Sequence, residues 1–230
     1  MKRTLLLGSL VSLAGNLATA AVISWQTPSL ITGASDVSLQ GTYYGSWAPY
    51  NGNAPNTPVN GVSFQGFSDL PSLTHNFDDG GGYWGPSTPD ANYNELLKYG
   101  TYGFSADSKS FSWGGMTEGH TYLVQLWISD PRNIGLSRAA TVSSGVGDVS
   151  AVLNYPADGT GPGHYLIGTF VAGASGSQSI IIDPSQNGDT NAGSAQINLL
   201  QVRDLGVIPE PSCMALAGLG VIGLLGRRRR

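Results

Sequence analysis

The residues best suited to metal chemistry form a polar stretch in the second half of the chain. Asp183 is followed by Asn187, Asp189 and Asn191, which alternate with small residues. Calcium prefers such carboxylate and amide oxygens in a flexible loop. The stretch departs from the helix–loop–helix calcium pattern, because glycine falls at 193 and no glutamate closes the loop. These four residues are therefore a candidate calcium site, calcium is the only candidate cofactor, and a solvated turn is the alternative.

Two adjacent carboxylates, Asp78 and Asp79, stand before three glycines and form a second stretch with oxygen ligands. They make a poor acid–base pair, because successive side chains of an extended chain point in opposite directions. A solvated turn is the alternative here too.

The three histidines, His75, His120 and His164, stand far apart in the sequence. The chain has no G-x-S-x-G nucleophile motif and no H-E-x-x-H metal motif. We therefore expect the histidines to be surface or packing residues and the protein not to be an enzyme. A secreted hydrolase is the less favoured alternative, because the members of a catalytic triad need not be neighbours in sequence.

Four aromatic residues lie in polar, loop-like segments and could stack on sugar rings. They are Tyr44, Trp47, Tyr83 and Trp84, surrounded by Gly, Asn and Pro. Aromatic rings beside polar groups suit glycans, since each ring offers an apolar face and its neighbours offer hydrogen bonds. We expect these four to be candidate glycan contacts; the alternative is that they close the ends of the fold.

The elements that must position these residues are short and mostly extended. Strand-like runs recur at about ten-residue spacing with turn residues between them, which predicts an all-β sandwich. The clearest strand is 121–129, with Tyr122, Val124, Leu126 and Ile128 on one face. The other expected strands are 22–26, 36–40, 59–67, 110–113, 138–143, 149–153, 165–171, 179–182 and 196–205.

One short helix interrupts this pattern. Asp90 is a candidate N-cap for a helix over 91–98, and Gly100 is the expected stop. The segment 69–89 before it is expected to be a long loop.

Charge and cysteine use restrict the partners of the body. Between residues 21 and 206 the chain has five basic and fourteen acidic residues, so its formal charge is about −9. Nucleic acids and anionic membrane surfaces attract basic patches, so an acidic body argues against both. The sole cysteine is Cys213, which excludes a disulfide framework in the body.

The N-terminus has the parts of a secretory signal peptide. Met1-Lys2-Arg3 is basic, Leu5 to Ala14 is apolar, and Ala18-Thr19-Ala20 is a small-residue cleavage site. We expect residues 1–20 to be removed by signal peptidase after passage through the secretion translocon.

The C-terminus has three parts in strict order. Pro209-Glu210-Pro211 comes first, an uncharged apolar run from Cys213 to Gly226 follows, and Arg227, Arg228, Arg229 and Arg230 end the chain. A helix over the fourteen apolar residues would span about 21 Å, less than the roughly 30 Å of a bilayer core. The arginines nevertheless suit a segment whose C-terminus stays in the cytoplasm. We expect transient membrane insertion, with a permanent anchor or an ordinary core helix as alternatives.

This order resembles the PEP-CTERM sorting signal of secreted bacterial proteins, here over residues 206–230. The resemblance implies recognition by an exosortase, a membrane transpeptidase that cuts near the Pro-Glu-Pro motif. It also implies a Gram-negative host and delivery to the envelope or the extracellular matrix.

The body, residues 21–205, is similar to jelly-roll domains of the galactose-binding type. The similarity lies in Gly119 to Asp130, His164 to Phe170 and Ala195 to Val202. We therefore expect a jelly-roll-like β-sandwich between a signal peptide and a hydrophobic sorting helix. Its expected role is structural or adhesive in association with extracellular polysaccharide, and a calcium-dependent carbohydrate-binding module is the alternative.

Overall fold

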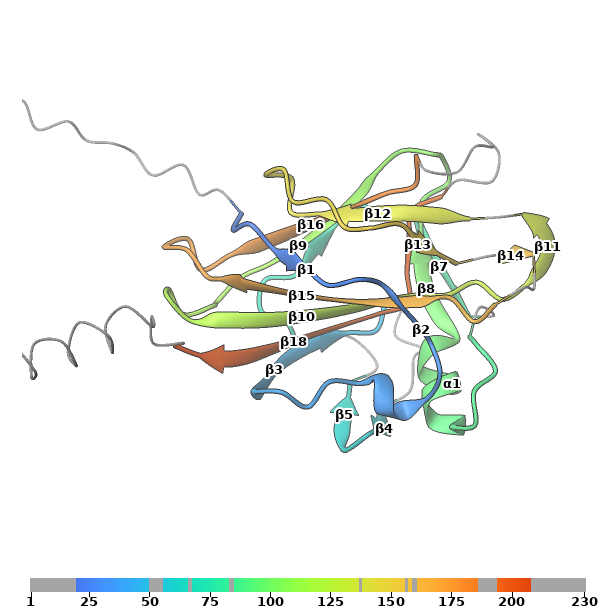
Figure 1. The fold of residues 1–230 in the computed structure, drawn as a ribbon, viewed down its shortest axis with the longest axis horizontal. Helices are drawn as coiled ribbons and strands as arrows, with labels where there is room; N and C mark the ends of the chain where they lie inside the picture. The colour runs from blue at the N-terminus through green and yellow to red at the C-terminus, as the bar shows by residue number, and fades with distance from the viewer. Residues whose placement is uncertain are drawn as a thin grey trace, which may run out of the picture.

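The computed structural model of the chain describes residues 20–49, 56–65, 68–82, 85–136, 138–155, 157–158, 161–185 and 194–207. Two antiparallel sheets stack face to face, and one short helix with a small hairpin covers the outer face of the larger sheet (Figure 1). The prediction of an all-β sandwich with one short helix is therefore confirmed.

The larger sheet has six strands. In spatial order they are β1 (Ser24–Trp25), β15 (His164–Val171), β10 (Thr121–Ile128), β18 (Leu199–Gly206) and β3 (Thr42–Trp47), with β2 (Ser29–Leu30) also pairing with β15. The facing five-stranded sheet has the order β13 (Leu153–Asn154), β12 (Ala139–Ser143), β16 (Gln178–Asp183), β9 (Lys109–Trp113) and β6 (Thr74–His75).

Three smaller pairings complete the strands. In the first, β8 (Tyr99–Tyr102) lies between β17 (Gln196–Ile197) and β7 (Asp79–Gly82). The other two are the pair of β11 (Asn133–Leu136) with β14 (Ala157–Asp158) and the pair of β4 (Thr57–Val59) with β5 (Val62–Phe64). The helices are η1 (Ala34–Asp36), a single 3₁₀ turn, and α1 (Ala91–Leu97).

Strand β10 lies at the centre of the molecule, because both of its faces are buried. Tyr122, Val124, Leu126 and Ile128 join the core between the two sheets, as their alternation predicts. On the opposite face, Trp127 joins a second core under α1 and the β4–β5 hairpin. All eight residues of β10 are buried, so the strand belongs to two hydrophobic layers at once.

The predicted helix is confirmed, and its start has the predicted cap. The Asp90 carboxylate accepts a hydrogen bond from the Tyr93 backbone amide at 2.7 Å. Gly100 is not the stop, because the chain enters β8 directly after Lys98. Tyr93, Leu96 and Leu97 are fully buried against the larger sheet, so tertiary packing adds to the cap in holding this short helix.

The prediction of a strand over 36–40 was wrong. Side chains on the outer face of the larger sheet form hydrogen bonds with the backbone N–H and C=O groups of this segment. Those groups are therefore not available to pair with a neighbouring strand. Gln125 accepts from the Ser38 amide and donates to the Asp36 carbonyl, and Arg203 donates to the Gln40 carbonyl. The segment is therefore a strap over the sheet, hydrogen-bonded to side chains.

The prediction of one continuous strand over 59–67 was wrong, because Val59 ends β4 and β5 begins at Val62 after a turn. Asn60 and Gly61 both have positive φ, at 49° and 75°, which is the geometry of a two-residue hairpin turn. The dipeptide Asn-Gly was a signal for this turn in the sequence, and residues 66–67 lie outside the described part.

The expected loop 69–89 contains two strands, β6 and β7. Strand β7 is built mostly of glycine and pairs with β8. A Cβ at Gly82 would lie 2.7 Å from the Tyr99 ring, so glycine lets that ring lie across the strand. Glycine-rich composition hid this strand, since glycine usually weakens strands. In the expected strand 149–153, only Leu153 is in a strand, at the start of β13.

Candidate binding surface at the distal end

The sandwich has two ends with different contents. Strand β10 runs from Thr121, which pairs with Gly206 and Val171, to Ile128, which pairs with His164. We call the first the tail-proximal end, because the described chain stops at residue 207, just after Gly206 (Figure 1). The distal end lies beyond Ile128, about 26 Å away for eight strand residues.

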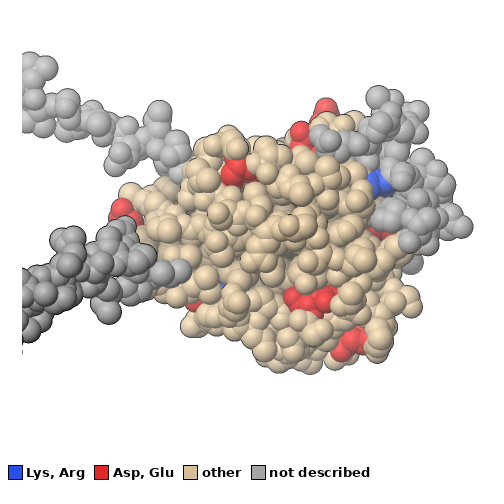
Figure 2. Space-filling model, in the orientation of Figure 1, with Lys and Arg blue, Asp and Glu red and all other residues tan. Residues whose placement is uncertain are grey.

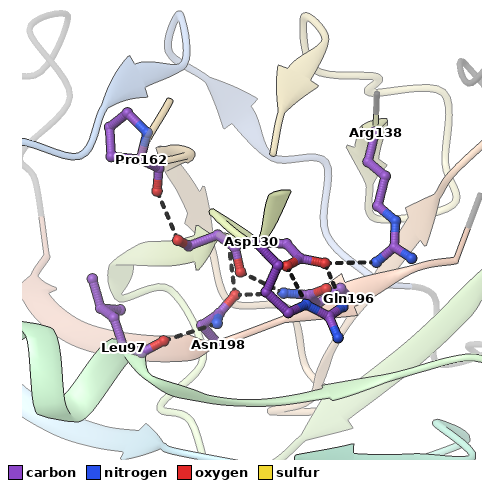
Figure 3. A network of polar contacts seen from close by, with 8 residues as sticks. Leu97, Asp130, Arg138, Pro162, Gln196 and Asn198 are labelled. Carbon is purple, nitrogen blue, oxygen red and sulfur yellow. Dashed lines mark hydrogen bonds and ion pairs between the residues drawn. The ribbon is translucent and has the colours of Figure 1, made fainter. Parts of the chain in front are cut away.

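A buried carboxylate organises the distal end. Asp130 is fully buried, and its two oxygens accept from Arg132 Nε and Nη2, both at 2.7 Å. Arg138 Nη1 donates to the same carboxylate at 2.8 Å (Figure 3). Two guanidinium groups therefore compensate one buried charge, one of them through a bidentate pair.

Amide side chains continue this network into the fold. Asn198 accepts from the Ser129 amide and donates to the Leu97 carbonyl at the end of α1 (Figure 3). Gln196 donates to the Ser129 carbonyl, and the Ser129 hydroxyl donates to the Pro162 carbonyl. The network joins α1, β10, β17 and the segment before β15, so the base of the distal end is preorganised.

An exposed aromatic ring stands at this end. Phe104 lies two residues after the end of β8, where Tyr102 pairs with Gln196 of this network. It is 71% exposed, and its ring meets the Tyr102 ring edge-on, with centroids 5.7 Å apart. The Phe104 amide donates to Asp78 at 2.8 Å, and Lys109 pairs with the same carboxylate at 2.8 Å. These two contacts hold the pKa of Asp78 below its usual value, and they fix the turn that presents Phe104.

Polar groups surround the Tyr102 ring. Its hydroxyl donates to Asp79 at 3.3 Å, and burial raises its pKa, as does the charge of Asp79. The positive charge of Arg132 acts in the opposite sense on the same pKa. Arg132 therefore lies within electrostatic reach of Tyr102, and the surface combines two aromatic rings with a carboxylate and a guanidinium.

The aromatic residues expected to bind glycans lie elsewhere or outside the described part. Trp47 is only 5% exposed and packs in the core between His75 and Phe111. Tyr44 packs edge-on against Tyr122 and donates its hydroxyl to the Gly114 carbonyl at 2.7 Å. The structure thus places both rings in packing roles, while residues 83 and 84 are not described.

The candidate calcium residues are mostly outside the described part as well. Asp183 ends β16 and accepts from the Ser185 amide at 2.9 Å, while Asn187, Asp189 and Asn191 are not described. Over the residues that the structure describes, no group of three or more His, Cys, Asp or Glu side chains could hold a metal ion. Asp78 and Asp79 have separate partners, so they do not act as a pair.

The three histidines are dispersed over the fold. His75 stacks on Trp47, and burial lowers its pKa. His120 contacts Asp204 at 3.0 Å at the tail-proximal end, whereas His164 contacts the Asn154 backbone at the distal end. Within the described hydrogen bonds, His120 has a carboxylate partner and no serine partner.

A shallow hollow of about 450 Å³ lies beside α1. Its lining consists of Gly85, Pro86, Ala91, Asn94, Glu95 and Lys98. Glu95 and Lys98 pair at 3.4 Å with both side chains more than 40% exposed. Such an exposed pair contributes little binding energy, so we do not assign a site there.

The distal surface was missed from the sequence, although one signal was present. Asp130, Pro131 and Arg132 directly follow the strand with the clearest alternation. Polar residues just beyond the end of a rigid strand are common at functional sites. Nothing in the sequence linked them to Phe104 or Asp78.

Comparison with solved structures yields distant likenesses. The ANXUR1 extracellular domain from Arabidopsis thaliana is 9% identical with a TM-score of 0.45, over 77% of this chain and 53% of that one. The exo-β-1,3-galactanase from Phanerochaete chrysosporium is 16% identical with a TM-score of 0.31, over 71% of this chain and 29% of that one. The chain therefore spans about half of the first structure and less than a third of the second. No curated protein sequence matches it.

The tail gives a specific match. Residues 207–230 match the model of the PEP-CTERM protein-sorting motif, and nearly all of them lie outside the described part. Within the described residues no helix is long and apolar enough to cross a membrane. The chain thus carries a PEP-CTERM sorting motif, which implies export to the cell envelope of a Gram-negative bacterium and processing by an exosortase.

Proposed function

We propose that this exported protein is a non-enzymatic structural or adhesive component that binds neutral extracellular polysaccharide through its distal end. The observation that carries the proposal is the exposed Phe104 ring on a fixed turn. It stands about one strand length from the point where the sorting tail begins. A body attached to the envelope at its C-terminal end would present the distal end outward.

The chemistry of the surface favours a neutral sugar. The apolar face of a pyranose ring stacks on an aromatic ring, and its hydroxyls need directional polar partners. Phe104 and Tyr102 offer rings, while Asp79 offers an acceptor. The fixed turn that presents Phe104 reduces the ordering cost of binding.

Charge argues against an anionic ligand. The five basic residues of the body all have partners: Lys98 pairs with Glu95, Lys109 with Asp78, and Arg132 and Arg138 with Asp130. Arg203 is buried under backbone carbonyls. On the face in Figure 2, acidic residues are scattered and basic colour is scarce. A phosphate or nucleic acid would find little attraction here.

The proposal is tested with the exported protein purified from its host. Electrophoresis through gels that contain the host's matrix polysaccharide should retard the wild type. Phe104→Ala should weaken this retention about tenfold, as expected for the loss of roughly 1.4 kcal/mol of stacking. Val171→Ala, an exposed apolar residue at the other end, is the matched control and should be retarded like the wild type.

Two results would decide against the proposal. An unretarded wild type would remove polysaccharide binding altogether, and equal losses in both variants would remove the distal end as its site. Repeating the gel with EDTA separates the calcium-dependent alternative, which requires retention to disappear when calcium is removed.

A further inference from the structure

The sorting motif begins very close to the folded body. Strand β18 ends at Gly206, and Pro209 follows three residues later. Three residues span at most about 11 Å. The apolar run begins at Cys213, six residues after Val207, which limits the whole connection to about 22 Å.

The end of β18 is held by hydrogen bonds, so its residues do not extend the connection. Gly206 pairs with Thr121, and its amide donates to Asp204 at 2.7 Å. Asp204 also contacts His120 at 3.0 Å. One residue earlier, Arg203 is held under the carbonyls of Gln40 and Gly41. Fraying β18 would break all of these contacts.

Exposed valines stand beside this exit point. Val171 and Gly206 both pair with Thr121 of β10, so they lie two strand spacings apart, about 10 Å. Ser24 pairs with Thr169, which brings Val22 to the same end beside β15. Val22, Val171 and Val207 are 64%, 55% and 65% exposed. The tail-proximal end therefore offers apolar surface within reach of the motif.

An enzyme that binds the motif must bring its active site close to this end of the fold. The active site of the enzyme must come within about 11 Å of Gly206 to bind Pro209. A small folded domain is about 30 Å across, so the enzyme is much wider than this gap. We propose that the tail-proximal valines, Val22, Val171 and Val207, form a docking surface for the membrane transpeptidase that processes the PEP-CTERM motif. This inference is independent of glycan binding.

The enzyme is a better occupant than the bilayer surface. The headgroup layer adds only about 5–8 Å beyond the hydrocarbon core, so it leaves part of the 22 Å connection free for protein. Glu118 is exposed in the turn just before His120, and Asp204 contacts His120. These acidic groups are repelled by anionic headgroups.

The experiment uses the full chain in a host that contains the transpeptidase, and it measures by intact mass the rate at which the tail is lost. Val22→Asp combined with Val171→Asp should slow processing about tenfold. Leu30→Asp is the matched control: Leu30 is 56% exposed and pairs with His164 at the distal end, so it should be processed normally. Fifteen Gly and Ser residues inserted between Val207 and Ile208 should restore processing of the double variant.

Every outcome bears on the proposal. Normal processing of the double variant would overturn it, as would a defect that the linker fails to restore, since that defect would not depend on contact at the exit point. A photo-crosslinking residue at position 171 should form an adduct with the transpeptidase. Adducts with lipid alone would assign the valines to the bilayer and overturn the proposal.

Discussion

The two ends of the sandwich differ in how they are stabilised and in what they expose to solvent. The distal end buries a carboxylate with two guanidinium groups and places an aromatic ring in solvent. The tail-proximal end has the His120–Asp204 contact, a strand end fixed by hydrogen bonds, and exposed valines. A surface fixed by buried polar groups suits selective binding, whereas exposed valines at the exit of the tail suit contact with the enzyme that processes the tail. The difference indicates that the two ends of the fold serve separate roles.

The largest effect expected within this comparison comes from Asp130→Ala. It would leave two partly buried guanidinium groups without their anion, which should lower the free energy of unfolding by about 3 kcal/mol. Urea denaturation measures it. Asp107→Ala, at an exposed carboxylate near the same end, should change stability by less than about 0.5 kcal/mol. A loss below 1 kcal/mol for Asp130→Ala would show that the network does not organise the distal end.

A smaller effect is expected for Asp204→Ala at the opposite end. The substitution removes the hydrogen bond from Gly206 and the contact with His120, which together should contribute about 1–2 kcal/mol. Amide hydrogen exchange should accelerate more at Gly206 than at Ile128, because Gly206 loses its local hydrogen bond as well as global stability. Glu118→Ala is the control, because that side chain is exposed. Unchanged exchange at Gly206 would mean that Asp204 does not tie off the strand.

A still smaller change is expected for Tyr44→Phe, which tests whether Tyr44 is a packing residue. Loss of the hydroxyl removes the bond to the Gly114 carbonyl and should cost about 1 kcal/mol. Retention on polysaccharide should not change. Weakened retention with unchanged stability would return Tyr44 to the glycan-contact set.

The mildest perturbation is acid acting on the turn that presents Phe104. The pKa of Asp78 is lowered in the fold, mainly by the hydrogen bond from Lys109. Its contribution is therefore complete above its ordinary pKa of 3.8 and is lost as the pH falls below that value. Retention on polysaccharide should weaken only as the pH falls from 3.8 through the lowered pKa of Asp78, with tryptophan fluorescence confirming that the fold persists. Asp78→Asn should remove this pH dependence, and an identical titration in that variant would contradict the assignment.

Local signals in the sequence predicted the parts that depend on local chemistry. The alternation over 121–129 predicted β10, and Asp90 predicted the start of α1, because periodicity and capping act over a few residues. The strap over 36–40 could not be predicted this way. Its backbone partners, Gln125 and Arg203, come from strands far along the chain.

The sequence by itself determined the destination of this protein and the class of its fold. A sorting motif can be recognised from its linear order of residues, and a sandwich can be predicted from strand periodicity, so both could be inferred without the folded structure. Only the tertiary structure decided the distal surface, because Asp78, Phe104 and Asp130 converge there through long-range pairing. It likewise moved Trp47 from candidate ligand contact to core, since burial depends on what packs above a side chain and not on its neighbours in sequence.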